Sequence, residues 1–176
     1  MPGILRCQNV NLNDPVVVRR VINALGDLAA QSKHSLEVRG TYHFAIPSGP
    51  ITTVAGWYVI CDESGEPLYV GTAENVDARL NSEPGSRDGF ANPKRTSDPV
   101  RNFIKSFFKN GVLPSLSVIT LSEPALCARI GIKAPLPKRD RENVEKVIDV
   151  FRTRILAQSR SVRANIALEP SAPART

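Results

Sequence analysis

Residues 56–71 read GWYVICDESGEPLYVG, and this stretch decides the fold. Its two arms, GWYVI and PLYVG, are rich in the β-branched and aromatic residues that favour strands. The intervening DESGE supplies the Asp, Ser and Gly that commonly form turns. The stretch therefore predicts an antiparallel β-hairpin in which each strand carries one tyrosine and one glycine.

The segment after the hairpin changes from strand spacing to helix spacing. Val76 and Leu80 are four positions apart in TAENVDARL, and they predict a short helix with Arg79 beside its apolar face. Residues 81–98 are polar, rich in Gly and Pro, and basic in their second half, so we expect a long surface loop. Long loops of this kind are often functional. The basic residues of this one are Arg87, Lys94 and Arg95.

The chain before the hairpin predicts one helix and short extended runs. Asp14 is suited to be an N-cap and Pro15 to be the first helical residue, so a helix begins here and should end near Ser32. Residues 35–47 alternate in two short runs, SLEVRG and TYHFAIP, which indicate strands or extended arms.

The chain after the loop predicts two helices around a strand. A helix from about residue 98 to Gly111 carries an aromatic stripe typical of a buried face. Residues 113–121 are rich in β-branched residues and predict a third central strand, and residues 123–140 are interpreted as a connector. A last helix is expected to be capped by Asp140 and to fray after Leu156.

The size and composition of the chain limit the class of protein to which it can belong. A chain of 176 residues is long enough for one domain with a hydrophobic core of its own. No apolar run approaches the roughly 20 residues that a membrane span needs, and no secretory signal is legible, so we expect a cytoplasmic protein. Three widely spaced cysteines fit neither a disulfide framework nor a zinc site. The formal net charge of +6 favours a polyanionic partner.

The order of these elements resembles the GIY-YIG nuclease superfamily. In that family a Gly-x-Tyr strand, a Tyr-x-Gly strand about ten residues later, a helical arginine and a downstream helical glutamate form one site. The matching residues are GWY at 56–58, YVG at 69–71, Arg79 and Glu145. The segment GTAENVDAR is also similar to the family's GxSxNLxxR. The resemblance covers about residues 54–168.

The resemblance implies a metal-dependent DNA endonuclease with a single Mg²⁺ or Mn²⁺. It assigns catalytic roles to Tyr58, Tyr69 and Arg79, with Glu145 as the metal ligand. Asn165 resembles the asparagine that often closes the family pattern, and we expect it to contact DNA together with the basic residues of the loop at 81–98.

These residue types suit phosphodiester hydrolysis on physical grounds as well. A tyrosine ordinarily has a pKa of about 10, so Tyr58 acts as a base only if nearby cations or metal-bound water favour its deprotonated form. Arg79 is a cation suited to that task, and a guanidinium also pairs with phosphate through two parallel hydrogen bonds. A carboxylate such as Glu145 holds one Mg²⁺ that keeps most of its waters.

The last helix contains three candidate carboxylates, which differ in their angular position around the helix axis. At about 100° per residue, Glu145 lies roughly 100° from the centre of the buried stripe, whereas Asp149 lies at about 140° and Glu142 at about 160°. A metal ligand should stand beside the packed face, where its backbone is fixed and its carboxylate reaches solvent. Glu145 meets this condition best. The stripe consists of Val144, Val147, Ile148, Phe151 and Ile155.

The predicted fold class is α/β, a small central and mostly antiparallel sheet flanked by helices. We expect an N-terminal extension over residues 1–53, a nuclease domain over 54–168 and a disordered tail over 169–176. A non-catalytic DNA-binding or scaffold protein on the same fold is the main alternative. A basic RNA-binding module is a weaker one, because no RNP-type motif or GXXG loop is present. The sequence gives no sign of an oligomeric state.

Overall fold

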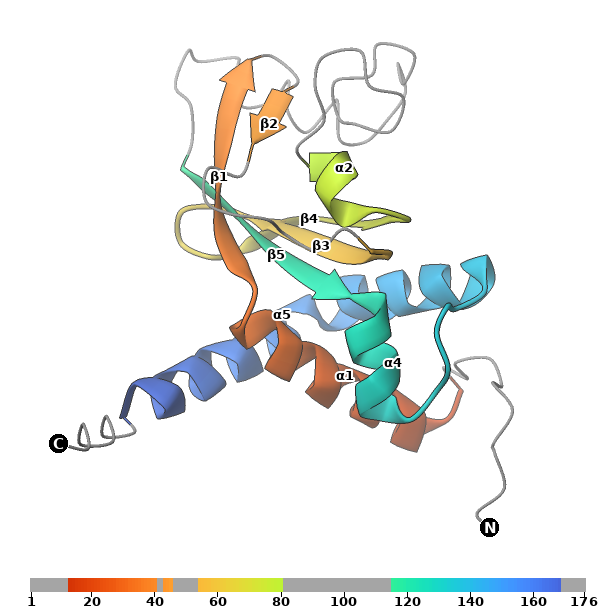
Figure 1. Ribbon diagram of the computed structural model, residues 1–176. Helices are drawn as coiled ribbons and strands as arrows, with labels where there is room; N and C mark the ends of the chain where they lie inside the picture. The colour runs from red at the N-terminus through yellow and green to blue at the C-terminus, as the bar shows by residue number, and fades with distance from the viewer. Residues whose placement is uncertain (1–12, 41–42, 46–53, 81–114, 169–176) are drawn as a thin grey trace, which may run out of the picture.

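A single antiparallel sheet organises the chain (Figure 1). The computed structural model describes residues 13–40, 43–45, 54–80 and 115–168. Within these residues, five strands lie in the order β2-β1-β5-β3-β4, and every neighbouring pair is antiparallel. The strands are β1 (Lys33–Gly40), β2 (His43–Ala45), β3 (Gly56–Cys61), β4 (Pro67–Ala73) and β5 (Leu116–Ser122). The predicted α/β class with an antiparallel sheet is confirmed.

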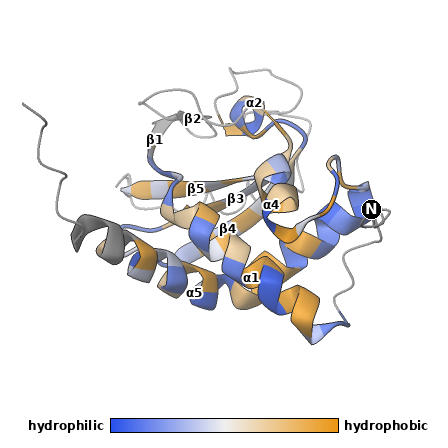
Figure 2. Ribbon diagram, turned by 60° about the horizontal axis from the view of Figure 1, so that its bottom comes forward, coloured by the Kyte–Doolittle hydropathy of each residue, from blue (hydrophilic) through white to orange (hydrophobic). Residues whose placement is uncertain are grey.

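Helices lie on both sides of this sheet (Figure 1). Three of them pack against one face, where their apolar side chains form the larger hydrophobic core. Figure 2, in which this side comes forward, shows hydrophobic and hydrophilic residues alternating along α1 and α5. The three are α1 (Pro15–Ala30), α4 (Glu123–Ile130) and α5 (Lys138–Leu168), and the short α2 (Val76–Leu80) packs on the other face.

The central strand β3 divides its side chains between two cores. Trp57 and Val59 belong to the core under α1, α4 and α5, whereas Tyr58 and Ile60 belong to the smaller core under α2. This division follows from the alternation of side chains along a strand. All six residues of β3 are buried, as expected for a strand paired on both edges and covered on both faces. The Tyr58 side chain therefore lies on the face of the sheet that α2 covers.

The predicted hairpin is confirmed, and its turn is built as the sequence indicates. The carboxylate of Asp62 accepts hydrogen bonds from the Ser64 backbone N–H and hydroxyl and from the Glu66 N–H. Gly65 adopts φ of +85°, a conformation that suits glycine. These contacts fix the chain reversal, and thereby the register that places Tyr58 opposite Gly71.

The N-terminal residues share the sheet and the core with the rest of the chain. Helix α1 begins as predicted, because the Asp14 carboxylate accepts from the Val16 N–H and Pro15 follows it. The helix packs along α5, and Gln158 of α5 lies over Gly26 and donates to the Asn23 carbonyl. Strand β1 pairs with β5 in the middle of the sheet. The described part of residues 1–53 thus shares the core of the predicted nuclease domain.

Two predictions about the second half of the chain are wrong. The stretch 123–140 was expected to be a connector, yet it contains α4, whose N-cap Ser122 accepts from the Ala125 N–H and which ends at Gly131 in the left-handed conformation. Its start signal, Ser followed by Glu and Pro, is a common one. Its shortness hides the apolar periodicity.

Helix α5 also differs from its prediction at both ends. It begins at Lys138, two residues before the expected cap Asp140, and it continues through Leu156 to Leu168. Its buried face extends past the expected end because Leu156 and Ser159 are buried too. None of the helices in the described ranges is long and apolar enough to cross a membrane. The loop with Arg87, Lys94 and Arg95, the aromatic helix after it and the tail lie outside the described residues.

We predict that two glycine substitutions differ sharply in cost. An added Cβ at Gly56 overlaps the backbone carbonyl oxygen of Leu121 in the neighbouring strand β5, which cannot move aside, so Gly56→Ala should destabilise the protein by about 3 kcal/mol or more. At Gly65 no atom lies near an added Cβ, and Gly65→Ala should cost about 1 kcal/mol through its positive φ alone. Urea unfolding checks the ranking. Equal costs would show that β3 and β5 are not packed so closely.

Candidate active site

Tyr58 and Gly71 face each other across the hairpin, and their contact accounts for the second glycine. A Cβ added to Gly71 would overlap the hydroxyl and ring of Tyr58, so the ring lies directly over the glycine. Any larger residue at position 71 would displace the ring. Glycine in a strand often marks such a close approach. The YVG tripeptide therefore makes room for the tyrosine of GWY.

Arg79 meets Tyr58 from α2. The Nε of Arg79 donates to the Tyr58 hydroxyl oxygen at 3.4 Å. The short helix is held by its buried residues Val76 and Leu80, and the Asn75 side chain caps it by accepting from the Ala78 N–H. The predicted neighbourhood of Tyr58, Gly71 and Arg79 is thus found in the structure, although the three residues come from three elements.

Tyr69 lies on the same face of the sheet as Tyr58. Their ring centroids are 6.1 Å apart with an interplanar angle of 31°. Tyr69 is partly exposed, whereas the Tyr58 side chain has no exposed surface. Of the two tyrosines, only Tyr69 presents its side chain to solvent in this conformation.

A cavity opens beside Arg79 between α2 and the start of α5. Its volume is about 420 Å³. Its lining residues come from both helices, from the end of β4 and from the two residues after that strand, and the charged ones include bases and acids together. The lining consists of Thr72, Ala73, Glu74, Asn75, Ala78, Arg79, Lys138, Arg141 and Glu142. We call it the α2–α5 cavity.

Glu145 lies one turn farther along α5, in a different hollow. It lines a groove of about 260 Å³ together with Tyr69, Lys146 and Asp149. The structure therefore brings Glu145 close to the second tyrosine, and it is Glu142 that shares the α2–α5 cavity with Arg79. Asn165 lies in α5, but its side chain is outside the described residues.

The carboxyl group of Glu145 is electrostatically unfavourable where it stands. Partial burial raises its pKa above the ordinary value, and the neighbouring carboxylates Glu142 and Asp149 raise it further, against a smaller lowering by Lys146. Its carboxylate forms no ion pair or hydrogen bond with the described residues, whereas Glu142 is paired with Lys138 at 3.9 Å. A cation bound to Glu145 would relieve this repulsion.

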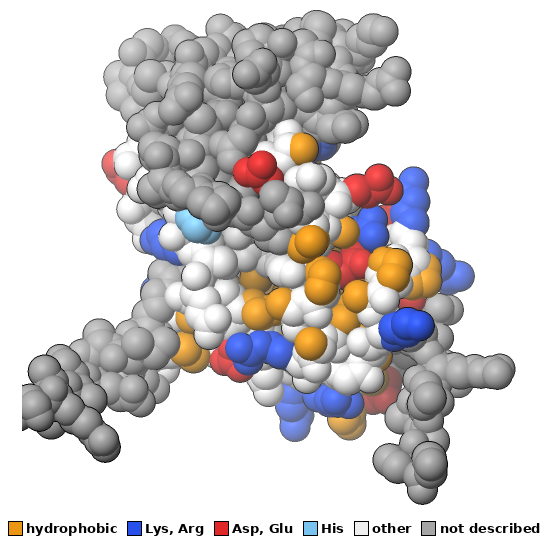
Figure 3. Space-filling view, in the orientation of Figure 1, with side chains coloured by type: hydrophobic (Ala, Val, Ile, Leu, Met, Phe, Trp, Pro, Cys, Tyr) orange, Lys and Arg blue, Asp and Glu red, His pale blue; other side chains and the backbone are white. Residues whose placement is uncertain are grey.

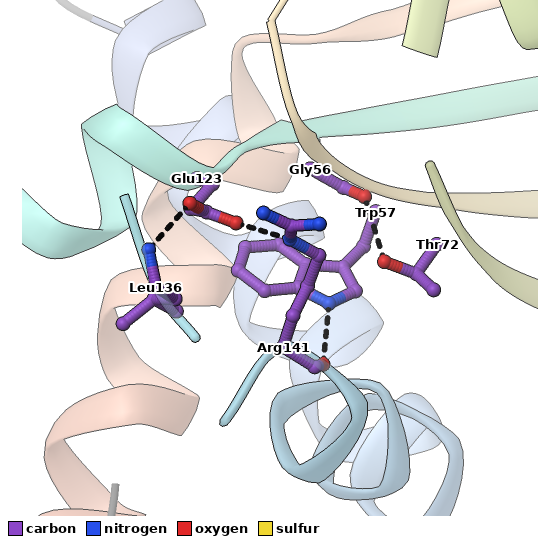
Figure 4. Close-up of polar contacts among 6 residues, drawn as sticks. All are labelled: Gly56, Trp57, Thr72, Glu123, Leu136 and Arg141. Carbon is purple, nitrogen blue, oxygen red and sulfur yellow. Dashed lines mark hydrogen bonds and ion pairs between the residues drawn. The ribbon is translucent and has the colours of Figure 1, made fainter. Parts of the chain in front are cut away.

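The sequence reasoning missed two residues that anchor this region. Glu123 is 1% exposed, and its two carboxylate oxygens accept from the Leu136 N–H at 2.8 Å and from the Arg141 Nε at 2.5 Å. The Arg141 carbonyl accepts from the Trp57 indole N–H at 3.0 Å (Figure 4). These bonds tie α4, β3 and the first turn of α5 together. No spacing in the sequence signals this contact.

Comparison with known proteins adds no further assignment. No protein-family model, curated protein or solved structure matches the chain. Any functional proposal therefore depends on the residues and their geometry.

The described residues contain no preformed cluster of metal ligands. In the described part of the chain, no group of three or more His, Cys, Asp and Glu side chains is arranged to hold a metal ion. This donor set does not fit an ion caged by protein ligands. It fits an ion that is bound through one carboxylate and keeps most of its waters, as Mg²⁺ often is.

We expect Glu145→Gln to stabilise the protein at neutral pH. The raised pKa means that the folded protein holds this proton to a higher pH than the unfolded chain, so the wild type loses stability as the pH rises from 4.5 through the folded-state pKa. Glutamine does not titrate. The variant should therefore exceed the wild type above that window and match it below. Urea unfolding midpoints measured from about pH 3 to about pH 8 test this.

Asp62 provides a control with the opposite sign. Hydrogen bonds from the Ser64 side chain and the Glu66 backbone lower its pKa, so its contribution to stability is present above the unfolded-state pKa and lost as the pH falls through the folded-state value. Asp62→Asn should lose stability at neutral pH. A Glu145→Gln curve parallel to that of the wild type would show that its surroundings are not unfavourable.

Proposed function

We propose that this chain is a metal-dependent DNA endonuclease of the GIY-YIG type. The observation that supports the proposal most is the contact between Arg79 and Tyr58 above Gly71. Chance resemblance of short tripeptides would not require the helical arginine to meet the first tyrosine. Here the three residues, separated in sequence, meet on one face of the sheet.

The proposed chemistry assigns a task to each residue. Tyr58 takes the proton of the attacking water, and the positive charge of Arg79 beside the phenol oxygen stabilises its deprotonated form. Arg79 also offsets charge that develops on the phosphoryl oxygens. Tyr69, on the same face, orients the water or the phosphate through its hydroxyl. The phosphodiester would approach from the side of α2.

The proposed metal ligand is Glu145, and the proposed ion is Mg²⁺ or Mn²⁺. When bound, such an ion neutralises charge on the phosphate and stabilises the leaving oxygen. Three features favour Glu145: partial burial, two carboxylate neighbours and no ion pair with the described residues. Glu142 is the competing carboxylate because it shares the cavity of Arg79, although Lys138 already pairs with it.

One observation favours the alternative, a non-catalytic DNA-binding protein on the same fold. The Tyr58 side chain is completely buried, so its hydroxyl does not meet solvent in this conformation. A tyrosine that only packs over Gly71 and hydrogen-bonds Arg79 would look the same. A cleavage assay separates the two functions.

DNA is the proposed partner under either function. The net charge of +6 favours it. Figure 3 shows blue basic side chains interspersed with red acidic ones on the face in view, without one continuous basic patch among the described residues. We therefore expect local phosphate contacts. Arg87, Lys94, Arg95 and Asn165 remain predicted DNA contacts.

Tyr58→Phe keeps the ring over Gly71 and removes only the hydroxyl. We expect it to lower the cleavage rate of supercoiled plasmid in Mg²⁺ by at least about 100-fold, the usual contribution of a general base. DNA binding and thermal stability should change little. Full activity would remove Tyr58 from the chemistry. A wild-type protein that binds the plasmid in Mg²⁺ and in Mn²⁺ without nicking it would establish the alternative function.

Glu145→Gln and Glu142→Gln form a matched pair for the metal ligand. They lie one turn apart on α5 and differ in the hollow that they line. We expect Glu145→Gln to abolish Mn²⁺ binding in calorimetric titration together with cleavage, and Glu142→Gln to retain both. The reverse result would move the metal to the α2–α5 cavity beside Arg79.

A further inference from the structure

A second arginine lines the α2–α5 cavity together with Arg79. Arg141 stands in the first turns of α5 and lines the cavity with Arg79 of α2. Its side chain is 13% exposed, which is unusually little for an arginine. A guanidinium withdrawn from water to this extent needs partners for its donors.

Among the described residues, the guanidinium of Arg141 is hydrogen-bonded through only one of its nitrogens. Its Nε donates to Glu123, and its backbone carbonyl accepts from Trp57. Figure 4 shows the guanidinium with a dashed line at Nε alone. Among the described residues, Nη1 and Nη2 have no hydrogen-bond partner. Glu123 therefore fixes the orientation of the guanidinium and leaves its two terminal nitrogens available.

The other charged groups of the cavity leave room for an anion. Lys138 and Glu142 form an ion pair at 3.9 Å, and the second acid, Glu74, is exposed. Arg79 adds its charge to the lining of the same cavity. Two guanidinium groups on different elements match the oxygens of a phosphate, which arginine binds through parallel hydrogen bonds.

We propose that Arg141 is a second phosphate-binding arginine, and that the α2–α5 cavity takes a phosphodiester group of a DNA backbone. The inference rests on the proposed function, since it places DNA at the site of Arg79. Glu123 acts as a positioning residue, because it holds Nε and so aims Nη1 and Nη2 into the cavity. Arg141 binds the substrate backbone and takes no part in proton transfer.

The test compares three variants by their binding to a short fluorescein-labelled DNA duplex in EDTA, as a function of KCl concentration. Arg141→Lys keeps a cation that can pair with Glu123 but has no terminal fork. It should bind about 10-fold more weakly with a log–log salt slope smaller by about one unit. Arg139→Lys, on the exposed neighbour outside the cavity, should leave affinity and slope unchanged.

Glu123→Gln separates binding from structure. It removes the buried carboxylate charge, so it should lower the melting temperature, because an unpaired member of a buried ion pair is strongly destabilising. Below that temperature it should bind the duplex more tightly than Arg141→Lys does, because the glutamine oxygen can still accept from Nε and orient the guanidinium. If Arg141→Lys binds with wild-type affinity and slope, Arg141 is only structural and the inference is overturned.

Cleavage of plasmid in Mg²⁺ is measured separately, so that the two proposals fail independently. A wild type that never nicks DNA but shows the Arg141 dependence refutes the nuclease and supports the phosphate site. A wild type that cleaves DNA while Arg141→Lys keeps its affinity and salt slope refutes the phosphate site alone. A wild type that binds no duplex refutes both.

Discussion

The buried ion pair between Glu123 and Arg141 determines how the largest helix meets the sheet. A carboxylate that is 1% exposed is stable only when its charge is paired and its lone pairs are filled, and Arg141 and the Leu136 N–H meet both needs. The pair joins the start of α4 to the start of α5, and Trp57 joins both to the central strand. The cavity beside Arg79 depends on this junction, because α5 supplies one of its walls.

The two faces of the sheet carry different sets of residues. The face under α1, α4 and α5 holds most of the hydrophobic core, and the face under α2 holds Tyr58 with a smaller one. Residues of α5 can approach the tyrosine face only around the edge strand β4, and both hollows that α5 lines lie along this strand. The candidate site is therefore built at an edge of the sheet. Such a site is open to a long polymer in a way that an enclosed pocket is not.

The sequence predicted the structure correctly where an element depends on residues that are close together in the chain. The hairpin at 56–71, the cap at Asp14 and the helix with Arg79 all follow from local turn and cap chemistry. The meeting of Tyr58 and Arg79 was expected from the resemblance to a family. Helix α4 was missed because eight residues show too little periodicity. The far end of α5 was missed because Ser159, which is buried there, is polar and adds nothing to a hydrophobic pattern. Glu123 and Arg141 lie 18 positions apart, and no local pattern marks such a pair.

The closeness of Tyr58 to Gly71 also constrains how this protein can change over evolutionary time. The ring occupies the volume that any Cβ at position 71 would need, so the two sites cannot be altered in arbitrary order. A lineage that keeps the aromatic ring must keep glycine opposite to it. A lineage that first loses the ring becomes free to accept alanine or serine at 71, and the return to tyrosine is then closed by the side chain that has replaced the glycine. The order of reversal is therefore fixed as well, because a lost tyrosine can return only after glycine has returned to position 71.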